Sequence, residues 1–297
     1  MTDGSMRRRS LLRTAGICIG AAVASSVTDT GSARAETVRS VFHRPTLVDP
    51  ATPRNARPSI GGTGRSLVFS DEFTGRSLDT SKWNAVEQHR SPGNHGVDYW
   101  YKSANVHVGG GALELGISQL GTDAYGGSRV DSQGKFDFTF GTIEYAIHVP
   151  PTIGHLAAAW LQAANGLTPG GVVDGTARDG EEIDIVETFS TDDKFGVTVH
   201  WDGYGADHRQ SNTVVTAPGL HDGTWYHTFT LDWTPTTMTF GYDGDVVRTI
   251  TDPALISQVK EFPIASNEII SYAQGDIHDA PLDWHSTMYV DYIRIWQ

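Results

Sequence analysis

One short stretch limits what this chain can fold into: residues 180–189 read Gly-Glu-Glu-Ile-Asp-Ile-Val-Glu-Thr-Phe. Glu182 and Asp184 are two residues apart, so on a β-strand they point to one face while the isoleucines between them point to the other. Glu187 lies five residues after Glu182, an odd step that would turn it to the apolar face. One extra residue, a β-bulge around Ile185–Val186, would return it to the side of the other acids. The stretch therefore predicts a bulged strand with three carboxyl groups on one wall.

Two glutamates on one wall fit the cleavage of a glycosidic bond with retention of configuration. That reaction uses a nucleophilic carboxylate and a carboxylic acid about 5–5.5 Å apart. Glutamates separated by about four strand steps of ~3.3 Å can lean together toward that distance on a curved sheet. The alternative is a strand with an apolar core face and a solvated acidic face, which the spacing alone does not exclude. Like charges crowded along one edge, however, raise the free energy of the ionised state.

Residues 182–187 resemble the bulged E-x-D-x-x-E signature of glycoside hydrolase family 16, the laminarinase, agarase and carrageenase relatives. The unbulged E-x-D-x-E form of lichenases and xyloglucan transglycosylases is not the one found here. The similarity covers residues 66–297 in the family's order. The other segments that resemble the family's strands are Phe69–Gly75, Leu78–Asp79, Lys82–Trp83, Gly134–Phe136, Gly141–Tyr145, Asp232–Pro235, Tyr242–Gly244 and Val290–Trp296.

The resemblance implies an all-β fold, a concanavalin-like jelly-roll sandwich of two curved antiparallel sheets with a concave substrate cleft. The composition agrees, because 33 Gly with abundant Thr and aromatic residues favours short strands and tight turns. We expect residues 66–297 to form one catalytic domain, since a single sandwich commonly has ~200–250 residues. The one helix that the sequence predicts is short, at Pro253–Val259, with Asp252 as its N-cap.

The resemblance also implies the roles of the acids. Glu182 would attack the anomeric carbon, and Glu187 would protonate the departing oxygen and later deprotonate water. Asp184 would hydrogen-bond the nucleophile and help to keep one acid ionised and the other protonated. Glu181 is an alternative inward acid, because it shares a face with Glu187 without any bulge. That register would leave Asp184 facing away, and the family signature also selects Glu182.

Sugar rings stack on aromatic side chains, so aromatic residues near the acids are candidates for substrate binding. Trp160 resembles a family tryptophan that forms the floor of the subsite near the cleaved bond, although small residues replace the usual Pro-x-Phe before it. His200 and Trp201 resemble the family's Thr-x-His segment. For each candidate taken singly, core packing or ordinary surface is the alternative. Further candidates for the cleft are Tyr99, Trp100, Arg129 and Trp284.

No cofactor is expected for the chemistry. The sequence has no Cys/His zinc pattern, and its Gly-rich run precedes a predicted strand rather than the helix of a phosphate-binding loop. The resemblance implies a structural calcium ion on the convex side of the sandwich, held by Glu72, the backbone of Gly111 and Asp291. Oxygen ligands suit calcium, and a solvated acid is the alternative for Asp291.

The first 35 residues have the features of an export signal. Arg8–Arg13 resembles a twin-arginine motif, the apolar run Ala15–Val27 is too short for an ordinary membrane-spanning helix, and Ala33–Ala35 fits a cleavage site. We expect residues 1–35 to be a signal peptide and the mature protein to be secreted, exported in its folded state. Residues 36–65 are expected to form a flexible Pro/Gly-rich leader or a surface-hugging arm.

Removal of the signal peptide would leave no cysteine, because the sole one is Cys18, and hence no disulfide. It would also remove five Arg and two Asp, leaving 17 basic and 33 acidic residues, a net charge of −16 with His neutral. That balance argues against nucleic acid and against sulfated or uronic polysaccharides as partners.

We therefore expect a secreted, monomeric, endo-acting retaining β-glycanase that acts on a neutral polysaccharide, most simply a β-1,3-glucan. One alternative is a β-galactan hydrolase of the agarase kind or a transglycosylase, which would share the acids. Another is a lectin-like sugar-binding protein on the same architecture without catalysis. Intact acids at 182, 184 and 187 argue against the lectin.

Overall fold

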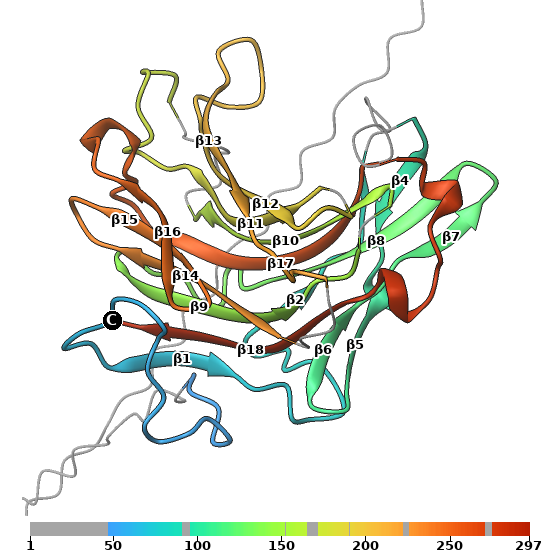
Figure 1. Cartoon of the computed structure of the whole chain (residues 1–297), viewed down its shortest axis with the longest axis horizontal. Coiled ribbons are helices and arrows are strands. Elements are labelled where there is room, and N and C mark those ends of the chain that lie inside the picture. The colour runs from blue at the N-terminus through green and yellow to red at the C-terminus, as the bar shows by residue number, and fades with distance from the viewer. Residues whose placement is uncertain are drawn as a thin grey trace, which may run out of the picture. The chain divides into compact units, whose positions relative to one another are not determined.

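Strands account for nearly all of the regular structure and lie in two layers (Figure 1). The computed structural model describes residues 47–90, 96–151, 153–164, 172–189, 191–221, 226–270 and 275–297. Residues 44–297 form one compact unit. Within the described ranges no helix has both the length and the hydropathy needed to cross a membrane. The expected signal peptide, residues 1–35, lies outside the described residues.

The first sheet has eight strands among the described residues. Its β15–β16 hairpin turns through Asp243 and Gly244, both with positive φ (49° and 87°), as a two-residue turn of the mirror-image type requires. The strand order is β16 (Asp245–Ile250), β15 (Met238–Tyr242), β14 (His227–Trp233), β9 (Gly141–His148), β18 (Met288–Trp296), β6 (Ala112–Leu115) and β5 (Val106–Gly109), with β1 (Leu67–Asp71) pairing with β18 beside this path.

The second sheet has ten strands within the same ranges. Its order is β13 (Arg209–Thr216), β12 (Lys194–Trp201), β11 (Glu182–Thr188), β10 (His155–Ala163), β17 (Glu261–Ile269), β8 (Ala124–Asp131), β4 (Asp98–Tyr101) and β3 (Gln88–Arg90), while β2 (Asn84–Ala85) and β7 (Ser118–Gly121) also pair with β8. The predicted jelly-roll sandwich is confirmed. One pairing departs from the expected antiparallel arrangement, because β4 runs parallel to β8.

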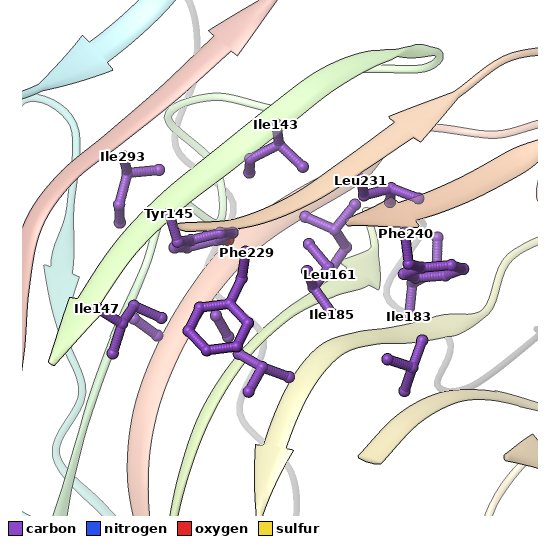
Figure 2. Close-up of a cluster of buried hydrophobic side chains, with 14 of the residues drawn as sticks. Ile143, Tyr145, Ile147, Leu161, Ile183, Ile185, Phe229, Leu231, Phe240 and Ile293 are labelled. Carbon is purple, nitrogen blue, oxygen red and sulfur yellow. The ribbon is translucent and has the colours of Figure 1, made fainter. Parts of the chain in front are cut away.

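The core lies between the two sheets (Figure 2). Every second residue of β9 points into it, as period-two alternation predicts. The facing side chains come from β10, β11 and β12 of the second sheet. The buried residues labelled in Figure 2 are Ile143, Tyr145, Ile147, Leu161, Ile183, Ile185, Phe229, Leu231, Phe240 and Ile293.

Residues 47–65 pack against the outer face of the first sheet. The Ser59 amide donates to Glu144 Oε2 at 2.6 Å, and Arg65 forms an ion pair with Asp232. Glu144 points away from the core, yet it is only 2% exposed. This part of the predicted leader is therefore an arm bound to the sheet, and it covers polar side chains of β9 and β14.

In the described part of the chain, a short 3₁₀ turn replaces the predicted helix, and such turns occur at three other places. Asp252 does cap the turn, since its side chain accepts from the Ala254 amide, but the helix ends at Leu255. Ile256 follows in extended conformation and is fully buried. The four turns are η1 (Ser103–Asn105), η2 (Pro253–Leu255), η3 (Ile277–Asp279) and η4 (Trp284–Ser286).

Candidate active site

A β-bulge interrupts β11 where the sequence predicts it. Two consecutive residues of β10, Ala159 and Trp160, pair with Val186 and Asp184, so Ile185 is the extra residue. Ile185 and Val186 are both buried in the core, and the glutamate that follows returns to the opposite face. The predicted bulge around Ile185–Val186 is confirmed.

The three acids line one cleft of about 800 Å³ on the face of the second sheet turned away from the core. The cleft is open to solvent, and its walls come from β10, β11, β17, β8 and the segments beside them. Besides Glu182, Asp184 and Glu187, its lining includes Arg90, Tyr101, Arg129, Asp131, Trp160, Gln162, Tyr204 and Glu268.

Glu182 accepts its hydrogen bonds on one oxygen. The Tyr204 hydroxyl donates to Oε2, and Gln162 Nε2 lies 3.4 Å from the same atom. Among the described residues no donor approaches Oε1, which leaves that oxygen open to the cleft. Loss of surrounding water raises the pKa of Glu182 to about 7, although His200 and the Tyr204 hydroxyl favour the ionised form.

Glu187 is held by a short chain from the next two strands. Thr198 Oγ1 donates to Glu187 Oε2 at 3.0 Å, and Asn212 Nδ2 donates to Thr198 Oγ1 at 2.7 Å. Burial raises the pKa of Glu187 to about 8, and the charge of Asp184 adds to the rise. At neutral pH this carboxyl group therefore tends to keep its proton.

Asp184 is 4% exposed and lies between the two glutamates on the strand. Burial raises the pKa of Asp184 well above its ordinary value, and the charges of Glu182 and Glu268 act in the same direction. His200 Nε2 lies 3.2 Å from Asp184 Oδ2. Three interacting carboxyl groups titrate as a cluster, so the apparent pKa values belong to the group.

Glu268 on β17 is a fourth carboxyl group of the cleft that the sequence did not single out. It accepts from Ser266 Oγ at 3.0 Å and from the Tyr99 hydroxyl at 3.2 Å. Its charge contributes to the raised pKa values of all three acids of β11. The sequence did contain one indication of this residue: Ser266 and Glu268 are two residues apart, so on a strand both polar side chains point to the same face.

Glu181, the alternative inward acid, lies on the other side of β11. It is fully buried, and its Oε1 accepts from the Ser257 amide at 3.1 Å. The Glu181 amide in turn donates to Glu261 Oε1 at 3.3 Å. Because Glu181 does not line the cleft, the register that uses Glu182 is the one the chain adopts.

Two of the predicted substrate-binding residues, Trp160 and Arg129, line the cleft. Trp160 Nε1 donates to Ser266 Oγ at 3.0 Å, which fixes the ring on the cleft wall. The Arg129 guanidinium lies 4.9 Å from the Trp160 ring centre and 3.0 Å from a carboxylate oxygen of Asp131. Ala158 lies two residues before Trp160, on the same face of β10, and this small residue also lines the cleft.

Five other candidates do not line the cleft in the described part of the chain. Trp201 is a core residue. Tyr99 is 1% exposed beneath Glu268, and Tyr101, on the same face of β4, lines the cleft in its place. His200 pairs with Glu182 across β11 and β12 and contacts Asp184. The remaining two lie elsewhere: Trp100 packs on His89 and Lys102, and Trp284 is 58% exposed and stacks on His285.

Tyr204 was not predicted from the sequence. It lies between β12 and β13, and its partly exposed ring lines the cleft beside Glu182. The buried Asp202 fixes this segment by accepting from the Asp174 and Gly175 amides. A loop has no side-chain alternation that predicts which way a residue points. The sequence indicated a place near the cleft for Tyr204 only through its closeness to His200.

The acidic residues offer two possible places for a metal ion. Ligand atoms of Glu182, Asp184 and His200 lie within 4.8 Å of one another, and we attribute this set to the carboxyl cluster of the cleft. At the expected calcium site, Arg294 donates to both oxygens of Glu72, at 2.8 and 2.7 Å. That carboxylate is already neutralised, which disfavours calcium at Glu72, and the calcium site stays a prediction.

A jelly roll with a cleft lined by paired carboxyl groups defines a class of carbohydrate-cleaving proteins. The model of glycosyl hydrolases family 16 matches residues 93–294. The chain belongs to this family and is a glycosidase.

Two curated relatives extend the comparison. The chain is 27% identical over 254 residues to a β-glucanase of Rhodothermus marinus, covering 78% of this chain and 85% of that protein. It is 24% identical over 271 residues to the glucan endo-1,3-β-glucosidase A1 of Niallia circulans, covering 81% of this chain and 39% of that protein.

Solved structures show the same fold. An endo-β-1,3-glucanase from Pyrococcus furiosus superposes with a TM-score of 0.62 at 20% identity, over 78% of this chain and 94% of that one. A family 16 endo-glucanase from Bacteroides ovatus superposes with a TM-score of 0.61 at 21% identity, over 76% of this chain and 99% of that one.

Proposed function

We propose that this glycosidase is an endo-acting, retaining β-glucanase of the bulged branch of the family, with a neutral β-1,3-linked glucan as substrate. The observation that carries the proposal is the bulge in β11, which brings Glu182, Asp184 and Glu187 to one wall of an open cleft. An open cleft admits the interior of a polymer, as endo action requires. The names of the two curated relatives support a β-glucan substrate.

The first step forms a covalent intermediate. Glu182 Oε1 attacks the anomeric carbon as the bond from that carbon to the leaving oxygen breaks. Glu187 gives its proton to the leaving oxygen, so the departing sugar leaves as a neutral alcohol. The products are a glycosyl ester of Glu182 and an ionised Glu187.

The second step restores the enzyme. Glu187, now a carboxylate, takes a proton from water while the water oxygen bonds to the anomeric carbon and the ester bond to Glu182 breaks. Two displacements at the same carbon retain its configuration. In transglycosylation a sugar hydroxyl would take the place of the water.

The pKa values of the two glutamates support this division of roles. The nucleophile must start ionised and the acid must start protonated. His200 and the Tyr204 hydroxyl favour the ionised form of Glu182, whereas burial and the charge of Asp184 favour the protonated form of Glu187. Both pKa values are raised toward the pH at which general acid catalysis is efficient. Asp184, with a raised pKa, can offer its proton to the nucleophile as a hydrogen bond.

The charge of the cleft supports a neutral substrate. Five carboxyl groups line it, at Asp131, Glu182, Asp184, Glu187 and Glu268. Two arginines also line it, Arg90 and Arg129, and Arg129 is engaged by Asp131, so the acids outnumber the arginines. A sulfated or uronic chain would approach this surface at an electrostatic cost.

A polysaccharide panel tests the proposal: laminarin, mixed-linkage glucan, agarose, carrageenan and xyloglucan, scored for new reducing ends and product size. We expect laminarin to be cut fastest, with a rapid fall in chain length. Agarose as the best substrate would favour the β-galactan alternative, longer products would indicate transglycosylation, and binding without cleavage would indicate a lectin. Proton NMR of the first-formed product then tests retention, because an initial α-anomer would mean inversion and carboxyl groups about 6.5–9.5 Å apart.

We further propose that the protein is exported folded by the twin-arginine route and acts outside the cell as a monomer. The arginine pair and small-residue cleavage site described above support export. Replacing Arg8 and Arg9 together with lysine should leave the enzyme inside the producing cell. Secretion of that variant at the normal level would contradict the route.

A further inference from the structure

Two histidines form a short hydrogen-bonded chain beside the carboxyl groups. His200 Nδ1 lies 2.9 Å from His208 Nε2, with an angle of 14° between the ring planes. A nitrogen–nitrogen contact of this length requires one ring to donate and the other to accept. Burial and the neighbouring His200 hold the pKa of His208 below its ordinary value. A neutral His208 can therefore supply one donor and one acceptor.

The other end of the chain reaches an unsatisfied acceptor. Asp184 Oδ2 is buried and has no hydrogen bond among the described residues, and His200 Nε2 lies 3.2 Å from it. Side chains buried as deeply as Asp184, whose side chain is 6% exposed, usually have a partner for each polar atom. Hydrogen bonds of catalytic groups are often loosely aligned before substrate binds. His200 can satisfy this oxygen if its hydrogen is on Nε2.

We propose that His208 is a positioning residue that fixes the tautomer of His200 and thereby turns the proton of Asp184 toward Glu182. His208 Nε2–H donates to His200 Nδ1, which places the hydrogen of His200 on Nε2. His200 Nε2–H then donates to Asp184 Oδ2. This assignment deepens the proposed function, since it concerns the nucleophile of that reaction.

The direction of this hydrogen-bond chain matters because burial raises the pKa of Asp184 and so favours a protonated carboxyl group, which has one hydrogen to donate. With His200 as donor, one oxygen of Asp184 is satisfied and the proton on the other oxygen is free to bond the nucleophile. In the opposite direction His200 would present a lone pair to Asp184 and draw that proton away from Glu182. Ligand atoms of Glu182, Asp184 and His200 lie within 4.8 Å of one another, so both outcomes are within reach. The unsatisfied Oδ2 selects the first direction.

The position of His208 separates its role from that of the substrate-binding residues. It does not line the cleft among the described residues, and its closest aromatic neighbours are His200 and the Tyr204 ring, 5.9 Å away. An effect of His208 on turnover must therefore pass through a neighbour. It should lower kcat with little change in KM.

The test compares His208→Gln with His208→Phe in the full chain. The Nε2 amide of glutamine can donate where the imidazole did, and phenylalanine cannot. Nitrogen-15 NMR of the substrate-free protein should show His200 protonated on Nε2 and not on Nδ1 in the wild type and in His208→Gln. In His208→Phe we expect a loss of that single tautomer and a kcat about tenfold lower. His107→Phe, at an exposed histidine of β5, is the control and should change neither.

Two results would overturn the proposal: a wild-type His200 protonated on Nδ1, or a His200 tautomer that is the same in His208→Phe. The NMR measurement needs no substrate, so it stands apart from the proposed function. A protein that cuts none of the polysaccharides, but whose His200 tautomer still changes in His208→Phe, would contradict the function and support the link from His208 to His200.

Discussion

Glu182 and Glu187 lie on the same strand, and the proposed chemistry needs both carboxyl groups. Glu182→Gln and Glu187→Gln should each lower turnover by several orders of magnitude, because each removes a group needed in a bond-breaking step. Both side chains line the open cleft and not the core, so neither change should lower the melting temperature. Turnover and thermal denaturation of the two variants measure this, and near-normal activity of either would make its assignment wrong.

Azide distinguishes the two roles. With an activated substrate, Glu187→Ala can still form the glycosyl ester, and azide can replace water in the second step. We expect partial rescue with a β-glycosyl azide as product. Glu182→Ala has no nucleophile, so any rescue should give the inverted α-azide. Proton NMR of the glycosyl azide gives its anomeric configuration. An α-azide from Glu187→Ala and a β-azide from Glu182→Ala would mean that Glu187 is the nucleophile and Glu182 is the acid.

Tyr204 should act on the ionisation of the nucleophile. Its hydroxyl donates to Glu182 Oε2 and favours the carboxylate form. Tyr204→Phe keeps the ring and removes the donor, so the pKa of Glu182 rises. Because the nucleophile must be ionised, the acid limb of kcat/KM should move to higher pH, by roughly one unit if the lost bond is typical of a charged acceptor.

A matched control exists in the other sheet. The Tyr292 hydroxyl donates to Glu144 Oε1 at 2.8 Å, which is also a tyrosine-to-glutamate bond but lies outside the cleft. Tyr292→Phe should leave the pH profile in place even if it lowers stability. A shift of the acid limb in both variants, or in neither, would argue against Tyr204 acting on Glu182.

At the scale of elements, the arm of residues 47–65 depends on one close approach. Gly61 has φ +64°, and a Cβ there would lie 2.3 Å from Asp232 Cγ. Gly64 also has a positive φ, +77°, but a Cβ there would meet nothing within 4 Å. Gly61→Ala should therefore cost roughly 2–4 kcal/mol and Gly64→Ala only the backbone strain of roughly 1–2 kcal/mol.

The readout of this comparison is thermal denaturation together with hydrogen exchange on β9. Displacement of the arm by Gly61→Ala should expose the outer face of β9 and speed exchange there, while Gly64→Ala should leave exchange unchanged. Equal losses of stability in the two variants would mean that the contact with Asp232 does not hold the arm.

The sequence predicts the positions of some residues of the site and not of others. The bulge was predictable because side-chain alternation counts residues, and the count from Glu182 to Glu187 is odd. Trp201 was placed in the cleft because alternation gives two faces but not which of them is the cleft. Tyr99 shares a face with Tyr101, which does line the cleft, so its position beneath Glu268 depends on tertiary packing. Tyr204 lies in a connection without periodicity, so its contact with Glu182 depends on tertiary structure. The helix after Asp252 is shortened for the same reason, since burial of Ile256 overrides local helix preference.

Across the whole molecule, stability should depend on pH through a buried pair of acids. Burial and the charge of Glu261 raise the pKa of Glu181 well above 4.5, and burial also raises that of Glu261. A carboxyl group with a raised folded-state pKa binds its proton more tightly when folded. Its contribution to stability is therefore present below the unfolded pKa and is lost as the pH rises toward the folded pKa.

Glu181→Gln should remove part of this loss. At about pH 8 its melting temperature should exceed that of the wild type by a few degrees, since one kcal/mol corresponds to about 2–4 °C at this size. At about pH 4 the two proteins should differ little. Calorimetry across this range measures it, with Asp245→Asn on the exposed β16 as control. A wild type that is the more stable at about pH 8 would show that Glu181 is needed as a carboxylate.

The bulge also has a consequence for how the strand can change in evolution. Ile185 is the unpaired residue of β11, so loss of its single codon would leave Glu-Ile-Asp-Val-Glu, a regular strand with an acid at every second position. All three carboxyl groups would still face the cleft, at the expense of one buried side chain. A lineage could therefore gain or shed the bulge in one event without first losing its catalytic acids, and the geometry between them could then be tuned separately.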